Sequence, residues 1–281
     1  MIGIMYKLIA IDLDGTLLDD DKDIPKENLI LIHELIDKGY EVVIATGRRY
    51  WSAKRLVKDI DRSLIILANN GNIVRDTLED KIIIKKYLDA EDFRILIKEG
   101  RRRGLHPIVH VDNYEEGYDI IIEMEKENQG YNNYISPDET RYRQIEDYLE
   151  LEDHKILAVI YAGNRRELES FHLDINERYP NRYNSHVMEN IQVAEALLEV
   201  MNPLGCKWLS LLEYAREKGI SPREIITIGD DNNDAQMIKN AGCGIAMKNA
   251  SKQVKAVADI ITEKDNNQSG VAFELKRVLD I

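Results

Sequence analysis

Residues 8–21 read LIAIDLDGTLLDDD, so four apolar residues run directly into a crowd of aspartates. Carboxylates at this spacing repel one another, and each of them costs free energy to remove from water. The stretch therefore indicates either a solvated surface turn or a site at which a cation makes the crowding favourable.

The first third of the chain alternates apolar runs with helical patterns. Residues 7–13, 41–47 and 63–71 have the composition of buried strands, and residues 26–40 and 51–61 between them have the pattern of helices. Continuous apolar runs separated by helices indicate a parallel sheet that is covered on both faces.

The last third of the chain resumes this alternation. It contains predicted helices at 207–219, 233–242 and 251–258 and predicted strands at 224–231, 244–247 and 259–262. The two outer segments therefore predict an α/β fold with a doubly wound, Rossmann-like parallel-sheet core.

The middle of the chain has a different order of elements. Helices are predicted at 90–105, 139–153 and 164–180, and strands at 106–112, 118–124, 155–163, 182–188 and 191–200. This mixed order is typical of an antiparallel α+β module. We expect a discontinuous core domain formed by residues 1–84 and 197–281, into which residues 85–196 are inserted as an α+β domain.

The composition argues against some classes of partner. The 281 residues have a formal net charge of −13, whereas binding to nucleic acid or to an anionic membrane requires a basic surface. The two cysteines, Cys206 and Cys243, have no metal or disulfide spacing, and the apolar N-terminal stretch is too short for a membrane span. We expect a cytoplasmic protein without a nucleic-acid or membrane partner, present as a monomer or homodimer.

A group of polar residues directly follows the end of each of four predicted strands. These groups are Asp12–Asp14, Thr46–Arg48, Asn69–Gly71 and Asp230–Asp234. Ligands of doubly wound sheets bind at this carboxyl edge, so Asp12 and Asp230 are expected to meet there. A hard divalent cation with oxygen ligands would resolve the repulsion among the carboxylates, and Mg²⁺ is the usual ion where phosphate also binds. An EF-hand is excluded, because neither DLDGTL nor DDNNDA has glycine at the sixth position.

Four motifs together resemble the signatures of the haloacid dehalogenase (HAD) superfamily. They are DLDGT at 12–16, TGR at 46–48, Lys207, and GDDNNDAQMIKNAGCGIAMKNA at 229–250, in that order along the chain. With ADIITEKDNNQSGVA at 258–272, their spacing is similar to that of the Cof-type phosphatase branch. In that branch a large α+β cap (type IIB) is inserted between the second and third signatures, so the resemblance implies that the inserted domain is a cap.

The chemistry and the resemblance together suggest roles for the first motif. Asp12 is expected to be the nucleophile, because an aspartate that attacks phosphorus forms an aspartyl-phosphate and divides hydrolysis into two displacements. Asp14 is expected on the same side of the extended backbone, where it would protonate the leaving alkoxide and then deprotonate water. In the family the backbone carbonyl of Asp14 also binds the metal. Gly15 permits a sharp turn, and the hydroxyl of Thr16 is expected to support the loop.

The later motifs supply the expected phosphate contacts. Thr46 and Lys207 would hold the transferring phosphoryl oxygens, and Lys207 brings the local positive charge that this acidic chain needs. Gly47, Arg48 and Asn233 are further candidates for substrate binding, although Arg48 fits a surface salt bridge equally well and Asn233 could instead orient its loop.

The expected metal ligands are Asp12, Asp14 and Asp230, of which Asp230 contributes its side chain from the last motif. Asp234 is expected to support Lys207 or a water molecule bound to the metal. Trp208 departs from the family pattern, since relatives often have glycine at this position. The difference is expected to affect the packing around this residue more than the chemistry of the site.

These residues favour a Mg²⁺-dependent phosphatase that acts on a small phosphorylated metabolite, such as a sugar phosphate or a nucleotide-related phosphate. A dehalogenase has no use for the acid at Asp14, whereas phosphatases and phosphomutases both keep it. Two alternatives remain open: a sugar phosphomutase, and a metabolite-binding regulatory protein whose hydrolysis is incidental. The cap would present the groups that select the substrate, for which the expected loops at 106–110 and 114–118 are candidates.

Two runs of charge are expected to have structural explanations. Arg101–Arg103 precede Gly104 at a predicted helix end, where cations favour the helix dipole and glycine favours the cap. The remaining aspartates that follow the first motif, Asp19, Asp20, Asp21 and Asp23, are expected to form a solvated acidic rim.

Overall fold

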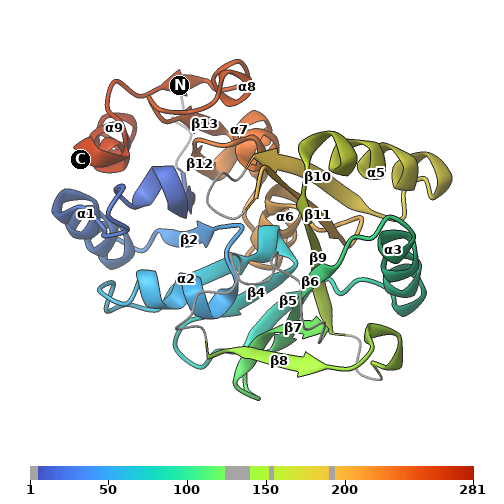
Figure 1. Ribbon diagram of the computed structural model, residues 1–281. Coiled ribbons are helices and arrows are strands. Elements are labelled where there is room, and N and C mark those ends of the chain that lie inside the picture. The colour runs from blue at the N-terminus through green and yellow to red at the C-terminus, as the bar shows by residue number, and fades with distance from the viewer. Residues whose placement is uncertain (1–5, 124–139, 152–154, 190–193) are drawn as a thin grey trace. The chain divides into compact units, whose positions relative to one another are not determined.

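The structure is a computed structural model that describes residues 6–123, 140–151, 155–189 and 194–281 (Figure 1). The chain divides into two compact units, one spanning Met1–Lys85 and Cys206–Ile281 and the other spanning Lys86–Gly205. The second unit therefore interrupts the first in sequence. The second unit ends at residue 205, nine residues beyond the expected end of the insertion at 196. The difference arises because the strand Ala196–Met201 belongs to the sheet of the second unit.

The first unit contains an eight-stranded sheet in the order β14-β13-β12-β1-β2-β3-β4-β5. Its strands are β1 (Leu8–Asp12), β2 (Glu41–Ala45), β3 (Ile65–Ala68), β4 (Ile73–Asp76), β5 (Ile82–Lys85), β12 (Ile225–Gly229), β13 (Cys243–Ala246) and β14 (Ile260–Ile261). The strands from β14 to β3 are all parallel, whereas β4 is antiparallel to both of its neighbours, β3 and β5. Every residue of β1 is buried, as expected for a central strand covered on both faces.

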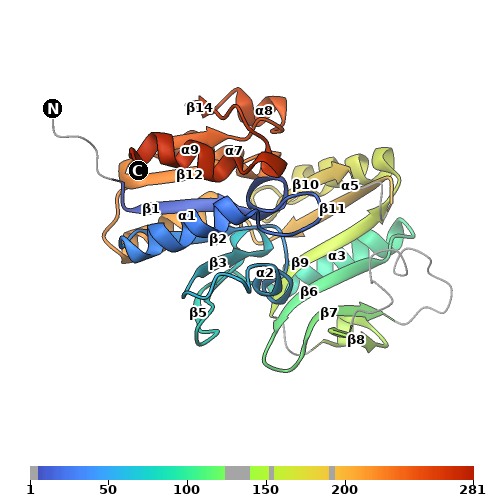
Figure 2. The same cartoon turned by 90° about the vertical axis from the view of Figure 1, so that its left-hand side faces the viewer.

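Helices cover both faces of this sheet. They are α1 (Lys26–Asp37), α2 (Tyr50–Leu56), α6 (Lys207–Glu217), α7 (Ala235–Asn240), α8 (Lys252–Lys255) and α9 (Gly270–Leu279). Figure 1 shows α1 and α9 on one side of the sheet and α6 and α7 on the other, and each pair is in contact. Leu31, Ile32 and Leu35 form the buried stripe of α1, which lies in front of β1 and β2 in Figure 2. The predicted doubly wound α/β class is confirmed.

The parallel arrangement brings the polar ends of four strands to one edge of the sheet. Asp12 is the last residue of β1, and Thr46, Asn69 and Asp230 directly follow β2, β3 and β12. Because these strands are neighbours and run in the same direction, their carboxyl ends lie side by side.

The second unit contains a six-stranded sheet in the order β10-β11-β9-β6-β7-β8. Its strands are β6 (Pro107–Asn113), β7 (Tyr118–Glu123), β8 (Tyr142–Ile145), β9 (Ile156–Gly163), β10 (Asn184–Glu189) and β11 (Ala196–Met201), and its helices are α3 (Ala90–Arg102) and α5 (Arg165–Arg178). The pairs are antiparallel except for β7 with β8. Alternate strand residues such as Val109, Val159 and Leu198 pack with Phe93 of α3 and Phe171 of α5 into one core.

The helix predicted over 139–153 is wrong. Within residues 140–151, the structure has the strand β8 and a short 3₁₀ turn, Tyr148–Glu150, while residues 139, 152 and 153 lie outside the described residues. Two tertiary interactions override the helical pattern: β8 pairs with the edge of β7, and the buried Tyr148 hydroxyl donates to the carbonyl oxygen of Pro107.

Other differences concern short elements. The hairpin of β4 and β5 and the helix α9 were not predicted. The expected loop at 106–110 is mostly part of β6, whereas Tyr114–Gly117 form the turn before β7. The predicted helix end is present, because Arg101 and Arg102 lie in the last turn of α3 and Gly104 follows with a φ of +67°. Each of the three arginines also pairs with a carboxylate of the same unit.

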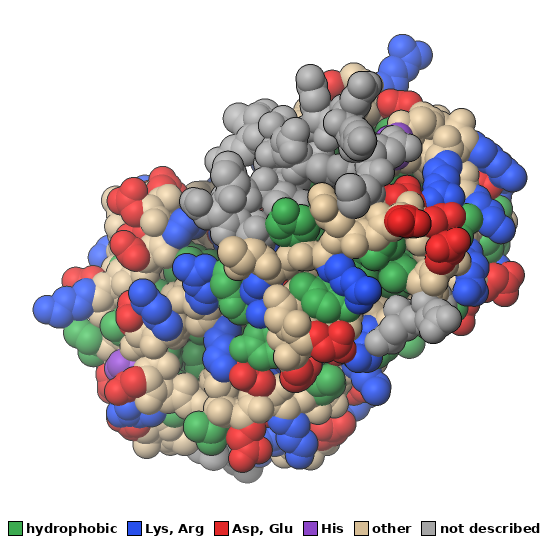
Figure 3. Space-filling view, turned by 60° about the horizontal axis from the view of Figure 1, so that its bottom comes forward, with side chains coloured by type: hydrophobic (Ala, Val, Ile, Leu, Met, Phe, Trp, Pro, Cys, Tyr) green, Lys and Arg blue, Asp and Glu red, His purple; other side chains and the backbone are tan. Residues whose placement is uncertain are grey.

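Acidic and basic side chains are interspersed on the face drawn in Figure 3, with apolar side chains between them. In the part of the chain that the structure describes, no helix is both long enough and apolar enough to span a lipid bilayer.

The packing of β13 against α7 depends on Gly244. A Cβ at this position would lie 1.9 Å from the backbone oxygen of Ile238. We expect Gly244→Ala to lower the free energy of unfolding by about 2–4 kcal/mol, because the backbone of α7 has to move away. Gly163→Ala in β9 is the matched control, since its Cβ would have no neighbour nearer than 3.7 Å, and it should change stability by less than about 0.5 kcal/mol. Urea unfolding followed by circular dichroism measures both, and equal midpoints for Gly244→Ala and wild type would contradict the prediction.

Candidate active site

A buried lysine joins two aspartates at the carboxyl edge of the first unit's sheet. The ammonium nitrogen Nζ of Lys207 donates to Oδ1 of Asp12 at 2.7 Å and to Oδ1 of Asp234 at 2.7 Å. The side chains of Lys207 and Asp234 are fully buried, and that of Asp12 is 8% exposed. Three charges are thus held together away from bulk water, where the ion pairs are strong and an unpaired member would be costly.

Each member of this cluster comes from a different structural element. Asp12 ends β1, Lys207 begins α6, and Asp234 ends the 3₁₀ turn Asn232–Asp234 after β12. Gly229 allows this approach, because a Cβ on it would lie 2.5 Å from a carboxylate oxygen of Asp234. Asp12 and Lys207, which are 195 positions apart in the sequence, therefore meet only in the folded chain.

Asp234 has both oxygens engaged. While Oδ1 accepts from Lys207, Oδ2 accepts from the backbone N–H groups of Asp230 at 3.0 Å and Asp231 at 3.1 Å. Asp234 therefore fixes the lysine and the loop that carries Asp230. This arrangement agrees with the supporting position expected for it.

Asp230 lies against the first motif. Its Oδ1 accepts from the hydroxyl of Thr16 at 2.9 Å. A Cβ on Gly15, whose φ is +73°, would lie only 2.4 Å from Oδ2 of Asp230, so both the turn and the contact require glycine. The side-chain amide of Asn249, which the sequence analysis did not single out, donates to the carbonyl oxygen of Gly15 at 2.8 Å.

The cluster contains more negative charge than Lys207 neutralises. Burial, and then the charge of Asp234, raise the pKa of Asp12 well above its ordinary value although Lys207 opposes the shift. Burial and the same neighbour raise the pKa of Asp230 to about 6. Burial alone would lower the pKa of Lys207, but the charges of Asp12 and Asp234 outweigh it and raise that pKa. A further cation is therefore favoured at this site.

The donor set suits a hard divalent cation. One carboxylate oxygen from each of Asp12, Asp230 and Asp234 lies within 4.8 Å of the others. Oxygen donors of this kind fit Mg²⁺ or Ca²⁺ and do not favour softer metals. Because the oxygens of Asp234 already accept from an ammonium and two N–H groups, Asp12 and Asp230 are the side chains better placed to hold an ion.

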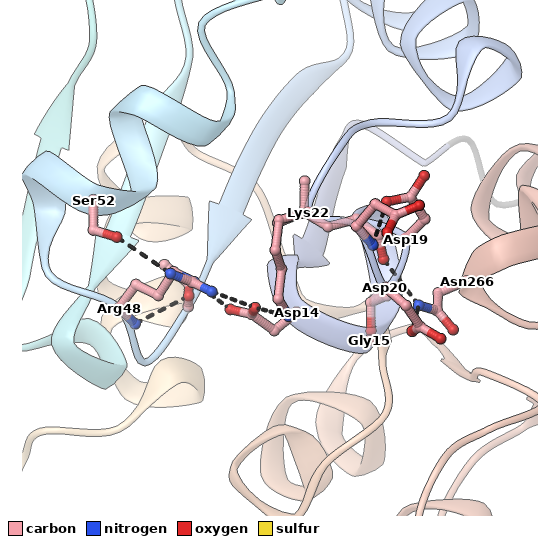
Figure 4. Close-up of polar contacts among 12 residues, drawn as sticks. Asp14, Gly15, Asp19, Asp20, Lys22, Arg48, Ser52 and Asn266 are labelled. Atoms are coloured by element: carbon pink, nitrogen blue, oxygen red, sulfur yellow. Dashed lines mark hydrogen bonds and ion pairs between the residues drawn. The ribbon is translucent and has the colours of Figure 1, made fainter. Parts of the chain in front are cut away.

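Asp14 faces two other cations, Arg48 and Lys22, as Figure 4 shows. Its Oδ2 accepts from Nε of Arg48 at 2.6 Å, and its Oδ1 accepts from Nη2 of Arg48 at 2.7 Å and from Nζ of Lys22 at 2.9 Å. Burial would raise the pKa of Asp14, but hydrogen bonds and charge from Arg48, and then from Lys22, outweigh it and lower that pKa. The salt-bridge interpretation of Arg48 is thus the one that the structure contains, with Asp14 itself as the partner.

Lys22 was missed by the sequence analysis. It has a φ of +68° in a turn in which Oδ1 of Asp19 accepts from the N–H groups of Asp21 and Asp23. Asp20 anchors the same turn by accepting from the side-chain amide of Asn266 (Figure 4). Asp20, Asp21 and Asp23 are exposed, as expected for an acidic rim, while Asp19 is half-buried, and Asp19 and Asp20 also hold this turn together through these hydrogen bonds. The only available signal was a lysine among aspartates close to the first motif.

Three successive residues after β3 have left-handed backbone conformations. The φ angles of Asn69, Asn70 and Gly71 are +47°, +54° and +87°. Such conformations cost about 1–3 kcal/mol for most residues, and asparagine and glycine tolerate them best. The turn contacts the second motif, because the N–H of Asn70 donates to the carbonyl oxygen of Thr46 and that of Asn69 donates to the carbonyl oxygen of Arg48.

The remaining predicted residues lie beside this turn. The hydroxyl oxygen of the buried Thr46 accepts from the N–H of Arg48 at 3.1 Å. The side-chain nitrogen of Asn233 donates to Oδ1 of Asn70 at 2.9 Å, and both amides lie against Gly47. The structure thus contains two groupings, one around Lys207 with Asp230 beside it and one in which Thr46, Gly47 and Asn233 adjoin Asn70.

The geometry can be compared with that of known proteins. The model of the haloacid dehalogenase-like hydrolases matches residues 9–275. The chain belongs to this family. The predicted membership is confirmed.

Similar proteins cover nearly the whole chain. YxeH of Bacillus subtilis (strain 168), whose name assigns it provisionally to the phosphatases, is 27% identical over 98% of this chain and 99% of its own. A second protein of that organism, 5-amino-6-(5-phospho-D-ribitylamino)uracil phosphatase YcsE, is 29% identical over 96% of this chain and 94% of its own. The crystal structure of a haloacid dehalogenase-like hydrolase from Bacteroides thetaiotaomicron has a TM-score of 0.79 and 26% identity, covering 97% of this chain and 99% of that one.

The crowded carboxylates predict an unusual dependence of stability on pH. The pKa of Asp230 in the native state, about 6, lies above its ordinary value of 3.8. Between these values the native state binds more protons than the unfolded chain, so the stability of the metal-free protein falls as the pH rises from about 4 to about 6. Asp230→Asn removes this charge and keeps an oxygen for Thr16. We expect the variant to be about 1–3 kcal/mol more stable than wild type near pH 7 and nearly equal to it near pH 4.

Urea unfolding with a chelator present at both pH values measures this difference. Asp37→Asn is the control, because the side chain of Asp37 is 60% exposed and its removal should change stability little at either pH. If Asp230→Asn were no more stable than wild type near pH 7, the repulsion inferred at this site would be wrong.

Proposed function

We propose that the protein is a Mg²⁺-dependent phosphatase that hydrolyses a small phosphorylated metabolite through an aspartyl-phosphate on Asp12. The observation that supports this most directly is the buried contact of Asp12 with Lys207, beside Asp230 at the carboxyl edge of the sheet. A nucleophile and a phosphate-binding cation are thereby combined with a site for a divalent ion. Membership of a hydrolase family, and relatives that are named as phosphatases, agree with this chemistry.

In the first step, a carboxylate oxygen of Asp12 attacks phosphorus and the bond from phosphorus to the leaving oxygen breaks. Asp14 gives a proton to that oxygen, so the alcohol leaves neutral. In the second step, Asp14 takes a proton from water, the water oxygen attacks phosphorus, and the carboxylate of Asp12 is regenerated with release of inorganic phosphate. Lys207, Thr46 and the amide of Asn233 would donate to the phosphoryl oxygens throughout.

The side chains of Asp12 and Asp230 and the backbone carbonyl of Asp14 would hold the Mg²⁺ ion. When bound, the ion supplies positive charge that stabilises the negative charge on the transferring group. Asp234 would act indirectly, by keeping Lys207 and the loop of Asp230 in place.

We propose the second unit as the cap that selects the substrate, with the Tyr114–Gly117 turn as one candidate for the selecting groups. A cap favours small substrates, because a protein loop would have to pass beneath it. The net charge of −13 and the interspersed charges in Figure 3 disfavour nucleic acid as a substrate on that face. Three relatives at 27–29% identity are named as 5-amino-6-(5-phospho-D-ribitylamino)uracil phosphatases, so this compound belongs in any test panel with sugar phosphates and nucleotides.

Phosphate release from such a panel, with Mg²⁺ and with chelator, tests the proposal. We expect release that requires Mg²⁺, and a fall of about 10³-fold or more in kcat for Asp12→Asn, because the amide is a poor nucleophile. The control is Asp61→Asn, whose side chain is 73% exposed and which should keep wild-type activity.

The other results have definite meanings. Conversion between positional isomers with little free phosphate would replace the proposal with a phosphomutase. Tight binding of a phosphorylated ligand with turnover far below about 1 s⁻¹ would replace it with a ligand-binding protein.

A further inference from the structure

We propose that Asn70 is a positioning residue, which holds the carboxamide of Asn233 so that its nitrogen faces the phosphoryl group. The inference rests on the proposed function, because it assigns to Asn233 the phosphate contact described above. It adds a residue outside the four motifs to the machinery of the site.

The backbone of Asn70 is held on several sides. Its N–H donates to the carbonyl oxygen of Thr46 at 3.0 Å, and the residue is only 4% exposed. The neighbouring Gly71 contacts the start of α6, because its carbonyl oxygen accepts from the hydroxyl of Ser210 at 2.6 Å. A Cβ on Gly71 would lie 2.9 Å from the backbone oxygen of Cys206. One turn thus connects the loop of Thr46 to the first turn of the helix that Lys207 begins.

The side chain of Asn70 extends the same connection to the last motif. Its Oδ1 accepts from Nδ2 of Asn233 at 2.9 Å. Gly47 leaves room for the pair, since a Cβ on it would lie 3.4 Å from Oδ1 of Asn70 and 3.7 Å from Nδ2 of Asn233. The three elements that bring Thr46, Lys207 and Asn233 to the site therefore all contact this turn.

The hydrogen bond determines which way the amide of Asn233 points. A carboxamide nitrogen has two N–H donors, so the bond to Asn70 uses one and leaves the other for a phosphoryl oxygen. If the amide rotated by half a turn, its oxygen would face Oδ1 of Asn70 and two acceptors would be opposed. Among the described residues, Oδ1 of Asn233 is buried and has no hydrogen-bond partner, so the bond through the nitrogen is what fixes this amide.

Asn70→Gly tests the side chain alone. It removes the carboxamide but keeps the backbone conformation, because glycine adopts the left-handed conformation readily. The matched control is Asn72→Ala. Asn72 is buried in the same turn and its amide donates to the carbonyl oxygen of Asn69, so its removal loosens the turn without touching the Asn70–Asn233 hydrogen bond. Circular dichroism and the melting temperature establish that each variant is folded.

Two measurements are made on each variant: the dissociation constant for inorganic phosphate with Mg²⁺ by calorimetry, and kcat/KM on the best substrate. We expect Asn70→Gly and Asn233→Ala each to weaken phosphate binding and to lower kcat/KM by about tenfold. In the double variant we expect less than a further twofold loss, because Asn70 acts through Asn233. Asn72→Ala and Asn233→Ala should instead have independent, multiplicative effects.

Multiplicative losses for Asn70→Gly and Asn233→Ala, or no loss for Asn70→Gly, would overturn the inference. If Asn70→Gly does not fold, Asn70→Asp replaces it and keeps the acceptor oxygen. Asn233→Ala should then still cost about tenfold in the Asn70→Asp background, and a cost below twofold would overturn the inference. A wild-type protein that binds phosphate but releases none from any substrate would contradict the proposed function, while the coupling in phosphate binding would still decide the role of Asn70.

Discussion

The site depends on one buried ammonium group. Lys207 is enclosed between Asp12 and Asp234, and its position requires that β1, α6 and the turn after β12 meet at one point. Breaking a buried ion pair by removing one partner typically costs 3–5 kcal/mol, since the remaining charge is left without compensation. The same contacts therefore hold these elements together and position Asp12, the nucleophile of the proposed mechanism.

This arrangement leaves an excess of negative charge that the fold alone does not relieve. Burial, and then the charge of Asp234, raise the pKa of both Asp12 and Asp230, so the second of these causes reflects this excess. The glycines at 15 and 229 make the crowding possible, because a methyl group at either position would collide with an aspartate. A protein selected only for stability would place neutral side chains here, so the repulsion that persists is an argument for a cation-dependent function.

The layers of the first unit were predictable because helix and strand periods are local. The regular alternation in the first and last thirds of the chain identified β1, β2, β3 and β12, and their shared direction placed Asp12 near Asp230. Local patterns failed where tertiary contacts decide the outcome. Residues 142–145 pair with an open sheet edge although their neighbours favour helix, and neither the contact of Lys22 with Asp14 nor that of Asn70 with Asn233 has a sequence spacing that would reveal it.

The ion pairs of Asp14 set a condition on any mechanism that uses it as an acid and a base. Both of its oxygens accept from cations, and its lowered pKa keeps it ionised, which suits the step in which water loses a proton. To protonate a leaving group, however, Asp14 must itself carry a proton. In the proposed mechanism an arriving phosphate would bring negative charge, which would compete with Asp14 for Arg48 and raise the pKa of this carboxyl. In the proposed mechanism the substrate would therefore supply the change that turns Asp14 from a paired carboxylate into a proton donor, and the resting ion pairs would keep Asp14 ionised until the substrate is bound.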